Sequence, residues 1–173
     1  MYSTVKRSGP KKRHILVIHV QNNPGVLNRV SSLFRRRRFN IESISAGHTE
    51  RADVTRITIE ADSDQVNTDQ LEKQLRKLIE VIEITEVDEK KATVREIALV
   101  KVRGAERARL EALIKKYGCR IASQSSECVT IEICTEPKKL DTLIARLKPF
   151  GVLELVRTGL AAVNRGLGLR TKG

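Results

Sequence analysis

The sequence is poor in aromatic residues and has no long apolar run. Aromatic side chains make up 3% of the 173 residues and tryptophan is absent, so few rings are available to stack on the bases of single-stranded nucleic acid. A membrane-spanning helix needs roughly 20 consecutive apolar residues, which this sequence lacks, and its basic start has no apolar segment like that of a signal peptide. We therefore expect no membrane span and a location in the cytoplasm.

Cysteine is scarce and has no metal-binding spacing. Cys119, Cys128 and Cys134 lie in the second half, the three histidines lie in the first, and no C-x-x-C pair occurs. This distribution argues against a disulfide framework or a zinc site, so we expect no metal. The motifs of a nucleophile elbow, a phosphate-binding loop and a zinc peptidase are absent as well. The sequence thus indicates no catalytic residue and a protein that is not an enzyme by itself.

The net charge of +12 is concentrated near the two ends of the sequence. Residues 1–13 carry +5 and residues 159–173 carry +3, which leaves only +4 for the 145 residues between them. The one dense internal cluster, Arg35–Arg38, either binds phosphate groups or is the solvated end of a helix, where cations suit the helix dipole. Since no nucleic-acid-binding motif accompanies the charge, we favour a flexible basic leader over 1–12 and a solvated helix end.

Apolar periodicity predicts the order βαββαβ over the first half. Strands are expected at 14–20, 40–47, 54–61 and 81–87. A helix is expected after Asn23, a favourable N-cap, with Pro24 at its first position. A second helix is expected to begin at Asn67. Its inner face is formed by Leu71, Leu75, Leu78 and Ile79.

The second half repeats this order. Strands are expected at 96–102, 120–123, 128–134 and 152–156. One helix is expected over 105–117, with Gly118 as its stop, and another begins at Pro137. The fold class is therefore α+β, with two tandem ferredoxin-like βαββαβ domains at 13–87 and 94–158 and a tail over 159–173. Domains of this size bury little surface alone, so we expect a homodimer that pairs the sheets side by side or face to face.

The junction between the first strand and the first helix is the best candidate for a binding site. The N-terminus of a helix presents unpaired N–H groups and a partial positive charge that suit a carboxylate. Gly25 has no Cβ, so a ligand can approach the amides of Gly25 and Val26. The side chains of Asn22, Asn28 and Asn40 offer amide groups to a ligand's ammonium. The alternative is that this Asn-Pro-Gly turn only caps the helix.

Several sequence runs follow one another in the order found in a known family. They are Asn22–Val30, Leu33–Arg36, Phe39–Ile44, Glu72–Leu78, Val94–Val102 and Arg157–Gly166. Together they resemble the small-subunit family of acetohydroxyacid synthase (acetolactate synthase), over nearly all of residues 13–168. The Asn-x-Pro-Gly turn is shared by many ACT domains, whereas the Phe-Asn-Ile-Glu-Ser, Arg-Glu-Ile-Ala-Leu-Val-Lys and Arg-Thr-Gly runs together are specific. The resemblance makes residues 13–87 an ACT domain.

The resemblance implies a non-catalytic regulatory subunit. Such a protein binds the catalytic subunit, raises its activity and confers feedback inhibition by a branched-chain amino acid, usually valine. Thiamine diphosphate, magnesium and FAD would belong to that partner, so no cofactor is expected in this chain. Effectors of the family lie between two ACT domains of a dimer. Carried onto this sequence, the effector-binding residues are Asn22, Gly25, Val26 and Asn40, with Asn28 and Gly47 in addition.

One position departs from the family pattern. The family usually has glycine just before the aromatic residue of the Asn-Ile-Glu strand, and here that residue is Arg38. A residue with a Cβ in the left-handed region costs about 1 kcal/mol, so the first helix either accepts this cost or ends differently. The change could move Asn40 and alter inhibition while activation survives.

Two other functions are compatible with the sequence. The charge and the Arg35–Arg38 cluster are compatible with a basic RNA-binding or scaffold protein that has ferredoxin-like halves, although such a reader needs aromatic residues on its central strands. The chain could also sense an amino acid for a different enzyme.

Overall fold

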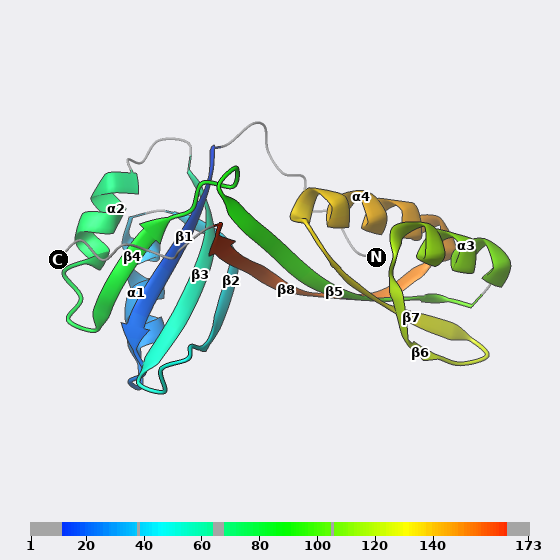
Figure 1. Cartoon of the computed structure of the whole chain (residues 1–173), viewed down its shortest axis with the longest axis horizontal. Coiled ribbons are helices and arrows are strands. Elements are labelled where there is room, and N and C mark those ends of the chain that lie inside the picture. Colours follow the sequence, from blue (N-terminus) through cyan, green and yellow to red (C-terminus); the bar gives the residue numbers. More distant parts are fainter. Residues whose placement is uncertain (1–11, 38, 64–67, 105, 166–173) are drawn as a thin grey trace. The chain divides into compact units, whose positions relative to one another are not determined.

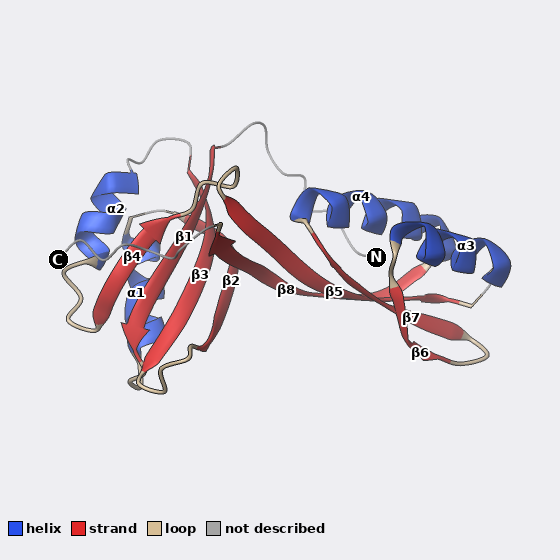
Figure 2. Ribbon diagram, viewed as in Figure 1, coloured by secondary structure: helices blue, strands red, loops and turns tan. Residues whose placement is uncertain are grey.

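The computed structural model describes residues 12–37, 39–63, 68–104 and 106–165. The chain divides between Lys90 and Lys91 into two compact units. Each unit has one four-stranded antiparallel sheet with two helices on one of its faces (Figures 1 and 2). The predicted α+β class and the repeated βαββαβ order are therefore confirmed. No helix in the described ranges combines the length and the apolar character that crossing a membrane requires.

The first unit has the strand order β2-β3-β1-β4. Strands β1 and β3 pair in the centre of this sheet, and β2 and β4 form its two edges. The elements are β1 (Lys12–Gln21), α1 (Val26–Arg36), β2 (Asn40–His48), β3 (Val54–Ser63), α2 (Thr68–Leu75) and β4 (Val81–Glu86).

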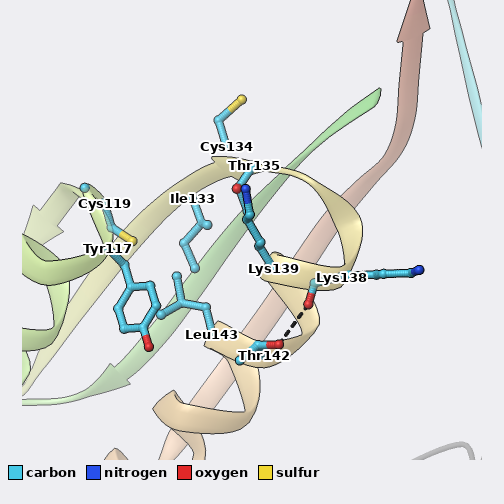
Figure 3. A pocket seen from close by; sticks show the side chains of 10 residues that line it. Tyr117, Cys119, Ile133, Cys134, Thr135, Lys138, Lys139, Thr142 and Leu143 are labelled. Carbon is cyan, nitrogen blue, oxygen red and sulfur yellow. Dashed lines mark hydrogen bonds between the residues drawn. The ribbon is translucent and has the colours of Figure 1, made fainter. Parts of the chain in front are cut away.

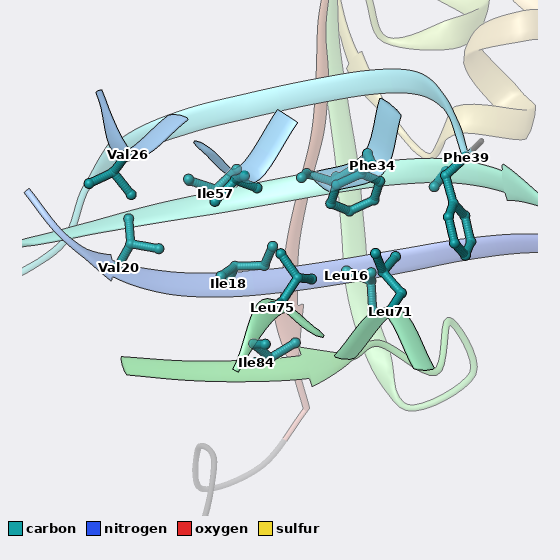
Figure 4. Close-up of a cluster of buried hydrophobic side chains, with 13 residues drawn as sticks. Leu16, Ile18, Val20, Val26, Phe34, Phe39, Ile57, Leu71, Leu75 and Ile84 are labelled. Carbon is teal, nitrogen blue, oxygen red and sulfur yellow. The ribbon is translucent and has the colours of Figure 1, made fainter. Parts of the chain in front are cut away.

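The core of the first unit lies between the sheet and its two helices (Figure 4). Alternate residues of β1, such as Leu16 and Ile18, point toward α1, as the period of a strand requires. They meet Val30 and Phe34, which are fully buried on one side of α1. The ring of Phe34 also packs edge-on against Phe39, with 6.0 Å between the centroids. Each such buried side chain stabilises the fold by about 1.5–3 kcal/mol.

The second predicted helix is shorter than its apolar pattern suggested. Helix α2 ends at Leu75, and a tighter turn follows, in which the N–H of Leu78 donates to the carbonyl of Leu75, three residues earlier, over 3.0 Å. Leu71, Leu75 and Leu78 contact the core, but Ile79 is 88% exposed, so its expected inward position is wrong. Because the helix has already ended, residue 79 no longer follows the helical period. The predicted start at Asn67 lies outside the described residues.

The second unit has the strand order β6-β7-β5-β8, which corresponds to that of the first unit. Its core is built from alternate residues of β5 and β7 and the inner faces of both helices. Gly118 ends α3 in the left-handed conformation and Pro137 begins α4, as predicted. The elements are β5 (Ala92–Arg103), α3 (Arg107–Tyr117), β6 (Arg120–Gln124), β7 (Cys128–Thr135), α4 (Pro137–Leu147), the 3₁₀ turn η1 (Lys148–Phe150) and β8 (Val152–Asn164).

The last strand is much longer than expected. Strand β8 continues to Asn164, so the described residues from Gly159 onward belong to the sheet, and the boundary expected between domain and tail is wrong there. Strand β5 likewise begins at Ala92, which pairs with Asn164. The apolar pattern missed this extension because Arg157, Thr158 and Gly159 interrupt the run of apolar residues.

Two of the sequence motifs meet across the β5–β8 pair. Arg157 donates from Nε to Oε1 of Glu96 over 2.8 Å and from Nη1 to Oδ1 of Asp141 over 2.8 Å. Glu96 is almost fully buried, and its hydrogen bonds raise the pKa of the Arg157 guanidinium above its usual value. Beside this ion pair, Gly159 has a φ of +79° where the strand register shifts. The Arg-Thr-Gly and Arg-Glu-Ile runs thus supply the two partners of a buried ion pair, and the glycine of the first run lies in a β-bulge.

Candidate functional site

The turn between β1 and α1 is built by backbone hydrogen bonds. The N–H of Asn23 donates to the carbonyl of Gln21 over 2.8 Å, and that of Val26 donates to the carbonyl of Asn23 over 3.4 Å. Gly25 has φ +82° and ψ −4°, which together with Pro24 before it gives a type II turn. Only glycine adopts this φ readily.

The N-cap of α1 is therefore Gly25 and not Asn23. The Gly25 carbonyl accepts the first helical bond, from the N–H of Arg29 over 3.1 Å. Pro24 lies in the turn instead of the first helical position, because Pro-Gly favours a type II turn. The side chain of Asn23 donates to Oε1 of Gln21 over 3.1 Å and caps nothing.

This helix N-terminus is open to an anion. Among the described residues, the N–H groups of Gly25, Leu27 and Asn28 have no hydrogen-bond acceptor. The first turn of α1 contains no acidic residue, and no side chain caps it. A Cβ built on Gly25 meets no atom within 4 Å. These free N–H groups and the helix dipole suit a carboxylate. The N–H of Val26, by contrast, is used within the turn, and its side chain is buried in the core.

Asn22 ties this turn to the β2–β3 hairpin. Its Oδ1 accepts from Oγ1 of Thr55 over 3.1 Å, and its backbone N–H donates to the carbonyl of Asp53 over 2.8 Å. Thr55 was not among the predicted site residues, although it lies on the alternating strand that the sequence placed here. One lone pair of the exposed Asn22 Oδ1 stays available, since an amide oxygen accepts two hydrogen bonds.

Asn40 and Gly47 lie at opposite ends of β2. Asn40 pairs with Asp62, near the start of β1, whereas Gly47 pairs with Arg56, near the end of β1 that leads to the turn. Seven residue-to-residue steps along an extended strand separate the two by about 23 Å. Within one chain, Asn22, Gly25, Val26, Asn28 and Gly47 thus share one end of the unit, and Asn40 lies at the other. The Asn40 amide donates to Oε1 of Glu42.

A polar row crosses the sheet at the level of Gly47. Gly47 pairs with Arg56, Arg56 with His19, and His19 with Glu83. Nη1 of Arg56 lies 3.2 Å from Nε2 of His19, and Nδ1 of His19 lies 3.6 Å from Oε2 of Glu83. Burial, followed by the nearby charge of Arg56, lowers the pKa of His19. Neutral His19 therefore accepts the Arg56 hydrogen bond through Nε2.

The C-terminal end of α1 leads into β2 without a described left-handed residue. Arg37 has φ −94°, and the N–H of Phe39 donates to the carbonyl of Phe34 over 3.1 Å. Arg35 and Arg36 occupy the last turn, where their charge suits the helix dipole as expected. The expectation about Arg38 lies outside the described residues.

Models of two protein families match the two units. Residues 16–83 match the "AHAS small subunit-like ACT domain", and residues 95–166 match the "Small subunit of acetolactate synthase". The βαββαβ fold and the first match make the first unit an ACT domain, so the chain belongs to the regulatory and not the catalytic class of protein.

Whole-chain comparisons give the family. The acetolactate synthase small subunit of Mycolicibacterium smegmatis is 41% identical over 88% of this chain and 91% of that protein. The one from Bacillus subtilis is 39% identical over 89% and 91%. The crystal structure of the acetolactate synthase small subunit from Thermotoga maritima superposes with a TM-score of 0.84 at 35% identity, covering 90% of this chain and 99% of that one. The chain belongs to the acetolactate synthase small-subunit family.

Proposed function

We propose that this chain binds the catalytic subunit of acetolactate synthase, raises its activity and makes it sensitive to valine or a related branched-chain amino acid. The proposal is supported by family membership over both units and by an ACT domain with an open helix N-terminus. Thiamine diphosphate, magnesium and FAD would be held by the catalytic subunit, and both subunits would work in the cytoplasm.

The observation that carries the effector site is the turn at Gly25. An amino acid's carboxylate would accept hydrogen bonds from the free N–H groups of Gly25, Leu27 and Asn28, close to the positive end of the helix dipole. The open space at Gly25 permits this approach. The ammonium group would be met by side-chain amide oxygens such as that of Asn22.

The position of Asn40 favours a site shared between two copies. In one chain Asn40 lies too far from Gly25 to contact the same small molecule. Strand β2 is an edge strand, so its outer hydrogen-bonding groups can pair with a second copy. If two β2 strands pair in antiparallel fashion about Ile44, Asn40 of one copy lies opposite His48 of the other and diagonally next to its Gly47, close to the turn at Gly25. We therefore propose a homodimer that completes two equivalent effector sites.

The carboxylate position is tested with two variants of Gly25. Gly25→Asp places a negative charge against the effector's carboxylate, and Gly25→Asn is its uncharged match in size. Both residues tolerate the left-handed conformation better than most. Calorimetry should show valine affinity falling by about a hundredfold in Gly25→Asp and by no more than a few-fold in Gly25→Asn, while both still activate the enzyme. Equal valine affinity in Gly25→Asp and the parent chain contradicts the site.

Sharing of the effector site between two copies is tested by mixing two variants that each bind valine weakly. Gly25→Asp and Asn40→Ala should each weaken valine binding when alone. In a mixed dimer the two substitutions fall together in one site, so the other site regains both native residues. Refolded equimolar mixtures should therefore recover about a quarter of the parent's valine sites, because half of the dimers are mixed. No recovery means that each site is built from a single chain.

The regulatory role is tested on pyruvate condensation. The chain is added to the catalytic subunit of its own source, and valine, leucine and isoleucine are titrated separately. We expect activity to rise on addition of the chain and to fall again with at least one of the three amino acids. Failure to activate, together with intact valine binding, would instead identify an amino-acid sensor for a different enzyme.

A further inference from the structure

A cationic hollow lies between α3 and the end of α4 in the second unit. Its volume is about 410 Å³. Three of its lining side chains are cationic, those of Arg109, Lys116 and Arg146, and none is acidic. Leu113 and Phe150 add apolar surface. The hollow is formed entirely within one unit, so its geometry does not depend on how the two units are placed.

Aromatic rings hold these cations in position. The guanidinium of Arg109 lies over the ring of Phe150, 5.5 Å from its centroid. The guanidinium of Arg146 lies 5.6 Å from the centroid of the Tyr117 ring, and the ammonium of Lys116 lies 6.0 Å from the same centroid. A guanidinium stacked on a ring keeps the N–H groups of its edge free to donate. The cations are thus ordered without their donors being used up.

Acidic side chains neutralise little of this charge. Arg109 donates to Oε2 of Glu106 over 2.8 Å from one of its nitrogens. Arg146 and Lys116 form no ion pair with any acidic residue in the ranges that the structure describes. Like charges that converge on one hollow repel each other, and a bound anion removes this repulsion. Guanidinium forks fit phosphate oxygens in particular, because two parallel N–H groups match two oxygens.

A second cavity, of mixed polar and apolar lining, adjoins the hollow at Tyr117, whose ring lies beneath Arg146; Figure 3 shows this cavity. This cavity has a volume of about 470 Å³ and lies between the end of α3 and the start of α4. Tyr117, Ile133 and Leu143 contribute its apolar lining. Tyr117 therefore lines the cavity while Arg146 lies over its ring, which places a cation at the border between apolar and charged surface. Pockets of this size and composition are typical of small-molecule sites.

We propose that the gap between α3 and α4 binds a phosphorylated small molecule that carries an apolar or planar group. The phosphate accepts hydrogen bonds from Arg146, Arg109 and Lys116, and the apolar group lies against Tyr117 in the adjoining cavity. A small molecule fits better than RNA, because the cations surround one hollow and Tyr117 is the single aromatic ring at its border with the cavity. This site is separate from the effector site proposed at Gly25.

The test uses calorimetry on the full chain at about 50 mM salt, where screening is weak. The probes are 1-naphthyl phosphate, which has both groups, and inorganic pyrophosphate, which has only the charge. Arg146→Gln should weaken binding of both probes about tenfold or more, the usual worth of a charge-assisted bidentate contact. Tyr117→Leu should weaken 1-naphthyl phosphate more than pyrophosphate. Lys77→Gln, which removes one positive charge from the first unit, should change the affinity for neither probe.

Three results would overturn the proposal. The first is equal weakening by Arg146→Gln and Lys77→Gln, which means attraction by net charge alone. The second is that neither probe binds the parent chain although that chain is folded, as shown by a thermal stability and fold equal to those of Lys116→Gln. The third is a single-stranded RNA that binds more tightly than 1-naphthyl phosphate and loses its affinity in Arg146→Gln, since this would assign the surface to nucleic acid.

Discussion

The two units share one fold but begin their first helix with different residues. Both have the same element order and corresponding strand orders, and in both the residue before the first helix is left-handed. In the first unit this residue is Gly25, with φ +82°, and in the second it is Glu106, with φ +57°. The carboxylate of Glu106 caps no helix N–H and pairs instead with the side chain of Arg109 over 2.8 Å. The fold thus offers a left-handed cap twice, and only the first unit fills it with glycine, whose missing Cβ leaves room for a ligand.

The units also differ in the polar contact that joins a central strand to the edge strand beside it. In the first unit, Nδ1 of the buried His14 on β1 lies 2.7 Å from Oε1 of Glu86 on β4. In the second, Arg157 on β8 bonds to the buried Glu96 on β5 and to Asp141 on α4. Arginine keeps its charge at all working pH values. The second unit therefore joins these strands through a permanently charged arginine and two carboxylates, and the first through a single histidine–carboxylate contact.

The largest effect is expected from Arg157→Leu. This change leaves Glu96 buried without its cation, and breaking a buried ion pair costs about 3 kcal/mol or more in the free energy of unfolding. Lys101→Leu is the matched control, because Lys101 pairs with Glu154 on the same two strands at an exposed position. That change should cost far less, because an exposed ion pair contributes little to stability. Urea unfolding measures both, and equal losses would show that Glu96 is not effectively buried.

A smaller effect, of opposite sign in the two units, is expected at the two left-handed caps. Gly25→Ala should destabilise by about 1 kcal/mol, because alanine is strained at this φ and its Cβ meets no atom that would compensate. Glu106→Gly should stabilise by up to about 1 kcal/mol, since it relieves the same strain and removes only an exposed ion pair. Thermal unfolding checks both. A loss of stability in Glu106→Gly would mean that its pair with Arg109 outweighs the strain.

Local chemistry made much of the fold predictable. The alternation from Val54 to Ala61 gave the central strand β3, and Gly118 and Pro137 marked a helix end and a helix start that the structure confirms. These signals act within a few residues, so no long-range contact can override them easily. The free amide at Gly25 followed from the same kind of signal.

The rest depended on contacts between residues far apart in the sequence. The Asn22–Thr55 hydrogen bond and the Arg157–Glu96 pair join segments separated by 33 and 61 residues. The hydrophobic periodicity of a single sequence gives no signal for such long-range pairs. The cap was misplaced for a different reason: Asn23 and Pro24 are good helix starters, yet the Pro-Gly pair favoured a turn more strongly.

The smallest effect is expected from pH, and it should appear in the first unit alone because all three histidines lie there. The pKa of His19 is lowered from its usual value of 6.5 by burial and by Arg56. A group that resists protonation in the folded state contributes stability that is complete above the unfolded pKa and is lost as the pH falls through the folded pKa. The first unit should therefore weaken below about pH 6.5.

His19→Gln should flatten this acid-side loss, because glutamine can still accept from Arg56 but cannot be protonated. His48→Gln is the matched control, since His48 is exposed at the end of β2. Urea unfolding from about pH 8 to pH 5, with hydrogen exchange assigning the change to β1 and β3, measures the effect. If the second unit weakens over the same range, the loss comes from carboxylates common to both units, and His19 does not set the difference between them.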